Sequence, residues 1–287
     1  MPYILRCPRC KLEYKLDSEL RFCSDCGSFL KHVYVEIGKP TEFPLDDEKV
    51  KIAEYIYYEY GELRKEIGDL EMDLLNSVKV NSASGRFDMI FLATLFSGWA
   101  MKEERAYSIW KNLTESFQES NTSLYSYLIG AKESQLIHLT TRYMIPPKTV
   151  LNIVETARNL RPHNGDINGL IDENSWVRTL ENIRKNCKGV NQKAFWFARV
   201  MRQKKAWGVP RQYCCVSDSH NKALLKKTGF IISDDDLYYN SLIMWNYFNE
   251  PFENKYYDLP VFRFARTHGC KKCSYQKCNL EMLSNCN

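Results

Sequence analysis

The most regular pattern along the chain is a helical spacing of apolar residues. Between residues 46 and 77, Val50, Ala53 and Ile56 fall near positions i, i+3 and i+6, with further apolar residues on the same face. A strongly apolar run that begins at Asp88 predicts a buried helix. Similar patterns predict helices over 102–117, 123–129, 134–143, 147–160, 175–186 and 192–204. Almost no alternating strand pattern follows the first 35 residues, so the chain is predicted to be mostly α.

The first 35 residues contain two pairs of cysteines. Each pair has Cys-x2-Cys spacing, and twelve residues separate the pairs: Cys7, Cys10, Cys23 and Cys26. Two-residue spacing lets both thiolates of a pair reach one metal ion, and four thiolates form a closed tetrahedral zinc site. Because so short a segment cannot fold on hydrophobic burial alone, bound zinc would stabilise it. We therefore predict a zinc ribbon at 1–35, with reduced, unliganded cysteines as the alternative.

A second group of four cysteines ends the chain: Cys270, Cys273, Cys278 and Cys286. All-thiolate ligation suits an iron–sulfur cluster and also suits zinc, and a tail without metal is the third possibility. The remaining cysteines, Cys187, Cys214 and Cys215, are isolated from both groups. We interpret these three as packing residues rather than ligands.

The distribution of charge is relevant to what the protein could bind. The 287 residues include 40 basic and 35 acidic side chains, and the basic ones concentrate in 178–227 and 263–277. Such a surface suits contacts with phosphate groups, although a solvated basic face explains it equally well. No apolar run reaches the roughly 18 residues of a membrane span, and the chain does not open on a signal-peptide pattern. We expect a cytoplasmic, nucleoid-associated protein that does not contact membranes.

The segment between the last two predicted helices has the character of a phosphate-binding hairpin. It is a five-residue segment that contains a glycine: Lys188, Gly189, Val190, Asn191 and Gln192. In such a hairpin, backbone N–H groups and the start of the second helix face a DNA phosphate without reading the base sequence. Lys193 follows in the first turn of the second helix.

This segment resembles the hairpin of the helix-hairpin-helix (HhH-GPD) DNA glycosylases, in particular their endonuclease III branch. That family carries Leu-Pro-Gly-Val-Gly, a variable residue and then the catalytic lysine, and the resemblance places Lys193 on this lysine. The Leu-Pro part is missing, and Asn191, which tolerates a left-handed backbone, replaces the second glycine. Downstream, Val216-Ser-Asp-Ser-His220 is similar to the family's Val-Asp-Thr-His-Val, which places Asp218 on the catalytic aspartate. The longer spacing implies an extra loop around 202–213.

The resemblance extends to both sides of this core. The turn at 163–167 and the apolar helix at 88–97 are similar to family elements, but Ser97-Gly98-Trp99 stands where the family often has Ser-Ala-Gln. Trp99 and His220 are candidates for the base pocket, and Phe195 and Trp196 are further candidates. Of Trp99, Phe195 and Trp196, at least two are expected to pack in the core instead. The terminal cysteines match the family's [4Fe–4S] loop in position and count, but not in spacing.

The fold implied by the resemblance is a two-lobed helical glycosylase. Its parts are a zinc ribbon at 1–35, N-terminal helices at 36–85 that pack with the C-terminal lobe, a helical barrel with the hairpin at 86–204, and a C-terminal lobe at 205–287 that holds Asp218 and the four-cysteine loop. The implied function is base-excision repair by a monomer acting on double-stranded DNA with a damaged or mismatched base. A flipped nucleotide would be attacked by Lys193, with Asp218 stabilising the cationic sugar, giving glycosylase and AP lyase activity.

Two questions stay open at this point. The base removed could be an oxidised pyrimidine, 8-oxoguanine, or a mismatched or deaminated base. The alternative function is a non-enzymatic DNA-binding protein that joins a zinc ribbon to a helix-hairpin-helix module, because the hairpin and the basic charge alone would serve that role.

Overall fold

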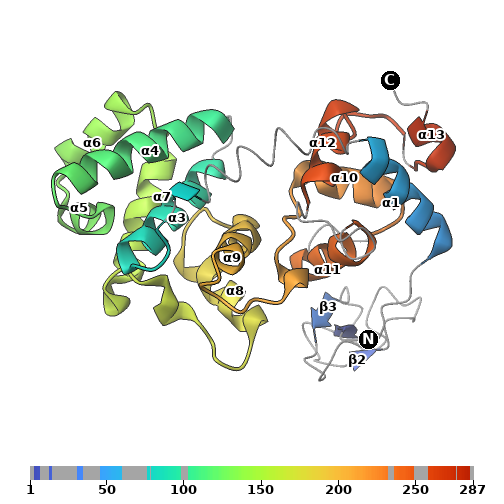
Figure 1. The fold of residues 1–287 in the computed structure, drawn as a ribbon, viewed down its shortest axis with the longest axis horizontal. Coiled ribbons are helices and arrows are strands. Elements are labelled where there is room, and N and C mark those ends of the chain that lie inside the picture. Colours follow the sequence, from blue (N-terminus) through green and yellow to red (C-terminus); the bar gives the residue numbers. More distant parts are fainter. Residues whose placement is uncertain are drawn as a thin grey trace. The chain divides into compact units, whose positions relative to one another are not determined.

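The computed structural model describes residues 3–6, 13–14, 31–34, 46–59, 76–77, 79–97, 103–231, 236–248, 258–275 and 277–284. This part of the chain is mostly helical, as predicted. The chain divides into two compact units (Figure 1). One unit combines Met1–Ile67 with Cys215–Asn287, and the other is the intervening Gly68–Cys214. The two ends of the chain therefore fold together, and the middle forms the second unit.

The middle unit is a group of helices around α3. Its elements are α3 (Ala83–Phe96), α4 (Glu103–Glu119), α5 (Leu124–Gly130), α6 (Glu133–Arg142), α7 (Pro147–Asn159), the 3-10 turns η1 (Arg161–His163) and η2 (Ile167–Leu170), α8 (Trp176–Asn186), α9 (Lys193–Gln203) and η3 (Arg211–Tyr213). Helix α3 contacts α4, α5, α7 and α9. Its Met89, Leu92 and Ala93 are fully buried, which explains why its sequence is apolar nearly all round.

Side-chain caps set several helix boundaries in this unit. Ser123 and Ser175 accept hydrogen bonds from N–H groups three residues ahead, and Pro147 opens α7. These helices begin within two residues of their predicted starts. Helix α3 begins at Ala83 rather than at Asp88, because the Ser82 hydroxyl caps it through the Gly85 N–H at 3.1 Å.

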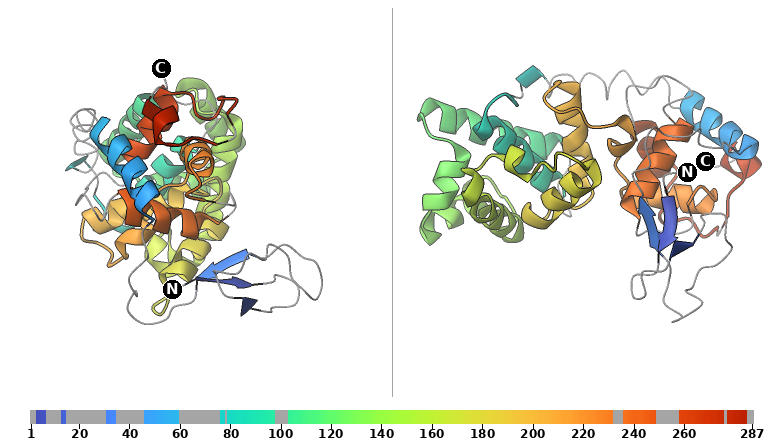
Figure 2. Two further views of the ribbon diagram at one scale, coloured as in Figure 1. Left: turned by 90° about the vertical axis from the view of Figure 1, so that its right-hand side faces the viewer. Right: turned by 90° about the horizontal axis from the view of Figure 1, so that it is seen from below.

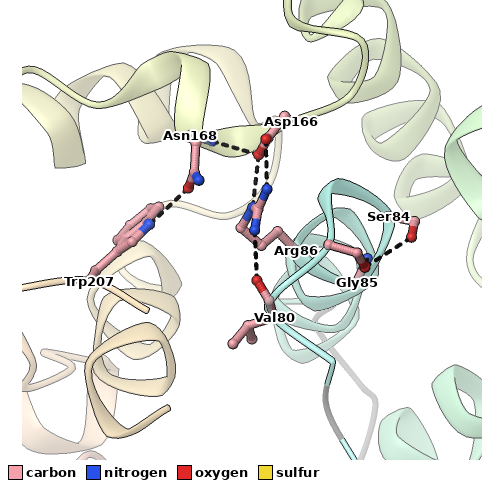
Figure 3. Close-up of polar contacts among 8 residues, drawn as sticks. Val80, Ser84, Gly85, Arg86, Asp166, Asn168 and Trp207 are labelled. Carbon is pink, nitrogen blue, oxygen red and sulfur yellow. Dashed lines mark hydrogen bonds and ion pairs between the residues drawn. The ribbon is translucent and has the colours of Figure 1, made fainter. Parts of the chain in front are cut away.

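A partly buried polar network fixes the start of α3 (Figure 3). The Arg86 guanidinium donates to both carboxylate oxygens of Asp166, at 2.8 and 2.6 Å, and to the Val80 carbonyl at 2.7 Å. Two further bonds extend the network, from the Asn168 N–H to Asp166 and from the Trp207 indole to the Asn168 side chain, both at 2.9 Å. The network therefore joins α3 to η2 and to the segment that follows α9.

The unit formed by the chain ends contains α1 (Asp47–Glu59), α10 (Ser219–Lys227), α11 (Leu237–Phe248), α12 (Leu259–Thr267) and α13 (Leu280–Ser284). Figure 2 shows these helices from two further sides. Helix α1 contacts α11, α12 and α13, and α10 packs on α12. An antiparallel sheet of order β2-β1-β3 precedes them, formed by β1 (Tyr3–Arg6), β2 (Glu13–Tyr14) and β3 (Lys31–Tyr34). None of the described helices is long and apolar enough to cross a membrane.

Candidate functional site

The predicted hairpin is present between α8 and α9. Its backbone turns through two left-handed residues, Gly189 at φ +78° and Asn191 at φ 42°. A larger residue would also clash at position 189, since a Cβ there would lie 2.6 Å from the Asn152 amide nitrogen. Hydrogen bonds from the Val190 N–H to the Cys187 carbonyl at 3.3 Å, and from the Lys193 N–H to the Val190 carbonyl at 2.8 Å, close the turn.

Helix α7 holds the hairpin through polar side chains. The Thr156 hydroxyl accepts a hydrogen bond from the Lys188 N–H at 2.8 Å, and the Asn159 amide donates to the Asn186 carbonyl at 2.9 Å. Cys187 and Val190 are fully buried beneath the turn, and burial raises the pKa of the Cys187 thiol well above its usual range. Cys187 therefore packs inside the fold, as predicted.

The outer side of the hairpin offers donors to an anion. Lys188, Gly189 and Gln192 are half-exposed, and Asn191 is exposed. Within the described part of the chain, the N–H groups of Gly189, Asn191 and Gln192 have no hydrogen-bond acceptor. Unpaired N–H groups within one turn beside a helix start are a typical setting for a phosphate oxygen. The structure thus gathers the five residues predicted to bind DNA into one turn, with the Val190 side chain as its buried anchor.

Lys193 is the first residue of α9 and so lies in the first turn of that helix, as predicted. Its half-exposed side chain places Nζ 5.9 Å from the centroid of the Phe96 ring, at the end of α3. The Phe96 ring meets the Trp196 ring edge-on, with centroids 5.0 Å apart. The Ser97 hydroxyl lies 3.3 Å from the Val190 carbonyl and 3.0 Å from the Ala93 carbonyl, and is positioned to donate to both. The end of α3 therefore fixes both the hairpin and the surroundings of the Lys193 amine.

The aromatic candidates for the base pocket have different outcomes. Phe195 is 1% exposed and Trp196 is 6% exposed, so both belong to the core. Trp99 lies outside the described residues. His220 is half-buried in α10, where its ring meets the Phe262 ring edge-on at a centroid distance of 5.7 Å.

Asp218 caps helix α10. One carboxylate oxygen accepts hydrogen bonds from the His220 N–H at 2.8 Å and the Asn221 N–H at 2.9 Å. The Asn221 amide in turn donates to the Val216 carbonyl at 2.7 Å, which fixes the segment before the cap. The positive end of the helix favours a negative charge at this position. Asp218 belongs to the unit of the chain ends and Lys193 to the middle unit, so different units supply the two predicted catalytic residues.

Part of the C-terminal cysteine segment is described. Cys270 is buried, and Cys273 and Cys278 are half-buried. Lys227, the last residue of α10, forms two hydrogen bonds to this segment. Its ammonium donates to the Cys273 carbonyl at 2.7 Å, and its carbonyl accepts from the Cys278 N–H at 2.8 Å. Cys214 and Cys215 are fully buried, in keeping with a packing role.

Neither predicted metal site is described completely. Cys7, Cys10, Cys23, Cys26 and Cys286 all lie outside the described residues. Among the residues that are described, no three His, Cys, Asp or Glu side chains gather closely enough to hold a metal ion. Zinc at the N-terminus and the cluster at the C-terminus therefore stay predictions.

Sequence reasoning missed the support that α7 gives the hairpin. Asn152, Thr156 and Asn159 follow one another at i, i+4 and i+7, so they form a polar stripe on one face of α7. Glu155, beside this stripe, places a carboxylate oxygen 3.3 Å from the Lys188 ammonium. The stripe itself is visible in the sequence, but its partner on the hairpin is not.

A scan against protein-family models, a search of curated proteins and a search of solved structures each found no match to this chain. The family resemblance is therefore carried by short motifs alone. The geometry of the hairpin, of Lys193 and of Asp218 is the basis for inferring a function.

Proposed function

We propose that this chain is a DNA glycosylase with AP lyase activity that uses Lys193 as its nucleophile. The observation that carries the proposal is the hairpin between α8 and α9, with its unpaired N–H groups and a lysine at the first position of the following helix. A phosphate-binding turn beside an amine is the arrangement that attack on a DNA sugar requires. The basic segments at 178–227 and 263–277 add the long-range attraction for a polyanion.

In this proposal the hairpin anchors one strand of a double-stranded substrate. The N–H groups of Gly189, Asn191 and Gln192, with the Lys188 ammonium, bind backbone phosphate oxygens. Such contacts carry no sequence information, so they hold damaged and undamaged duplexes alike. The protein acts as a monomer on a target nucleotide that has left the base stack.

The chemistry follows from an amine nucleophile. The Lys193 nitrogen forms a bond to C1′ while the glycosidic bond breaks, and the base leaves with the bonding electrons and takes up a proton. Loss of the amine proton and opening of the sugar give an imine, after which loss of a C2′ proton breaks the C3′–O bond and nicks the strand. Asp218 is the proposed acceptor of the amine proton and the counter-charge to the cationic sugar.

The metals have structural roles in this proposal. Cys7, Cys10, Cys23 and Cys26 would hold zinc, and Cys270, Cys273, Cys278 and Cys286 would hold a [4Fe–4S] cluster or zinc. No step of the reaction uses either group. Trp99 and His220 are the proposed contacts of the extruded base.

Borohydride trapping on a duplex with one abasic site tests this function. The wild type should give a covalent protein–DNA complex, and Lys193→Gln should give none while its DNA affinity persists. Lys204→Gln, which removes a charge at the other end of α9, is the control and should keep trapping. Full trapping by Lys193→Gln would show that another amine does the chemistry.

The same assay decides between the enzyme and a non-enzymatic DNA-binding module. The observation that favours the module is that the hairpin is complete within the middle unit, whereas Asp218 lies in the other unit. A wild-type protein that binds duplex DNA through the hairpin, but never forms a trapped complex or releases a base, would support the module instead.

A further inference from the structure

The one lysine of the hairpin already has an anionic partner inside the protein. The Lys188 ammonium lies 3.3 Å from a carboxylate oxygen of Glu155 on α7. The backbone N–H of the same lysine donates to Thr156, the next residue along that helix. Main chain and side chain of Lys188 are therefore both directed at one turn of α7.

This ion pair is open to solvent. The side chain of Lys188 is 40% exposed and that of Glu155 is 54% exposed. A pair as exposed as this contributes about 0–1 kcal/mol to stability, so a competing anion can replace the carboxylate at little cost. A phosphate oxygen offers the same charge and acceptor chemistry as the Glu155 carboxylate, and the neighbouring N–H groups of the hairpin add donors that Glu155 does not use.

We propose that Glu155 occupies the phosphate position of Lys188 in the DNA-free protein and that a phosphate of duplex DNA displaces it. The inference rests on the proposed binding of DNA by the hairpin. Once displaced, the carboxylate stays on α7 beside the incoming phosphate, where like charges repel. Glu155 therefore weakens every phosphate contact at this site, and only an anion with many simultaneous contacts overcomes the repulsion. The residue thus selects for an extended nucleic acid over small phosphates.

A second consequence concerns salt. Each lysine that neutralises a DNA phosphate releases counterions and steepens the salt dependence of binding. The Lys188–Glu155 pair carries no net charge, so wild-type Lys188 contributes little to that dependence. Removal of the carboxylate should restore the full contribution of the lysine.

The test is Glu155→Gln, with binding to an undamaged labelled duplex followed by fluorescence anisotropy over a range of salt concentrations. Kd should fall about threefold to fivefold near 0.1 M salt, which corresponds to removal of one exposed charge interaction. The slope of log K against log salt should steepen by up to about 0.9. The control is Glu115→Gln on α4, because Glu115 has the same 54% side-chain exposure and pairs with Lys111 at 4.0 Å. Its Kd and slope should equal those of the wild type.

Further variants separate failure of this inference from failure of the proposed function. Lys188→Gln should weaken binding, and Glu155→Gln added to Lys188→Gln should give none of the gain. If Lys188→Gln and Gly189→Val weaken binding but Glu155→Gln does not tighten it, the hairpin binds DNA and the inference about Glu155 is wrong. If none of these variants changes Kd while all remain folded, the hairpin is not the DNA anchor and both ideas fail.

Inorganic phosphate is the second probe. Its inhibition constant against labelled duplex, corrected for the duplex Kd of each protein, should be lower for Glu155→Gln than for the wild type. Equal inhibition constants for the two proteins would overturn the selective role of Glu155.

Discussion

The hairpin is positioned by contacts with distant parts of the sequence, whereas the Asp218 carboxylate is positioned by its sequence neighbours. The hairpin depends on residues distant in sequence: α7 supplies Thr156 and Asn159, and Ser97 is the C-cap residue of α3. Asp218 depends on its own neighbours, because its carboxylate bonds to N–H groups two and three residues ahead. The first geometry is set by packing of three helices, and the second by the local start of one helix.

This difference predicts which properties of the protein a substitution in each place should change. A change at the cap alters the charge of one carboxyl group and leaves the surrounding packing in place. A change in the hairpin also disturbs the helices that hold it, so binding and stability should fall together there. The variants below test this contrast, from the largest expected effect to the smallest.

Asp218→Asn should have the largest effect, on the rate of base release. The amide keeps an oxygen that can still cap α10, so the fold should persist, but the counter-charge to the cationic sugar is lost. Removal of a preorganised electrostatic group costs on the order of a hundredfold or more in rate. Single-turnover base release from a lesion duplex measures the effect, and Asp172→Asn, a change outside the cap, is the control. A large loss of DNA affinity would contradict the separation of cap from binding.

Gly189→Val should affect stability and binding together. The variant combines φ +78° with a Cβ placed 2.6 Å from the Asn152 amide, so the unfolding free energy should fall by roughly 2–3 kcal/mol. Affinity should fall for all duplexes alike, because the hairpin contacts phosphate. Thermal unfolding and anisotropy measure the two effects. Gly208→Val is the control, since a Cβ at Gly208 meets nothing within 4 Å; equal effects of both variants would show that the hairpin geometry is not special.

Most of the middle unit follows from local signals in the sequence, whereas the apolar pattern gave no helix ranges for the part that forms α10 to α13. The helices from α4 to α9 end within about three residues of their predicted bounds, because apolar period, serine caps and Pro147 mark them. The turn of the hairpin can also be predicted from the local sequence, since Gly189 and Asn191 are residues that adopt left-handed backbone positions. The contact of Glu155 with Lys188, by contrast, joins residues that only the packing of α7 on the hairpin brings together. A sequence pattern shows which residues share a helix face, but not which element that face meets.

Asp88 offers a pH test of α3, the helix that ends at the hairpin. Burial raises the pKa of this carboxyl from 3.8 to about 7. Between pH 4 and 7 the folded state keeps a proton that the unfolded state loses, so stability falls as pH rises and the loss is complete above about pH 7. Asp88→Asn should therefore have a higher unfolding free energy than the wild type at pH 8, and the difference between the two proteins should close towards pH 4. Urea unfolding of both proteins at pH 4 and pH 8 measures this difference in unfolding free energy. A difference that does not change with pH would contradict the raised pKa.

Thr156→Val should have the smallest effect and should show directly that α7 holds the hairpin. Valine keeps the shape of the side chain but leaves the Lys188 N–H without the acceptor it has at 2.8 Å. Loss of one such bond costs about 1 kcal/mol of unfolding free energy. Thr140→Val on α6 is the control, because the Thr140 hydroxyl bonds only to carbonyls of its own helix among the described residues. Since the Lys188 N–H then lacks a fixed direction, the affinity of Thr156→Val for duplex DNA should fall about twofold to threefold, whereas Thr140→Val should bind as the wild type does. If the two variants bind DNA equally well, contacts across helices do not set the hairpin geometry, and the contrast with the locally built Asp218 cap is lost.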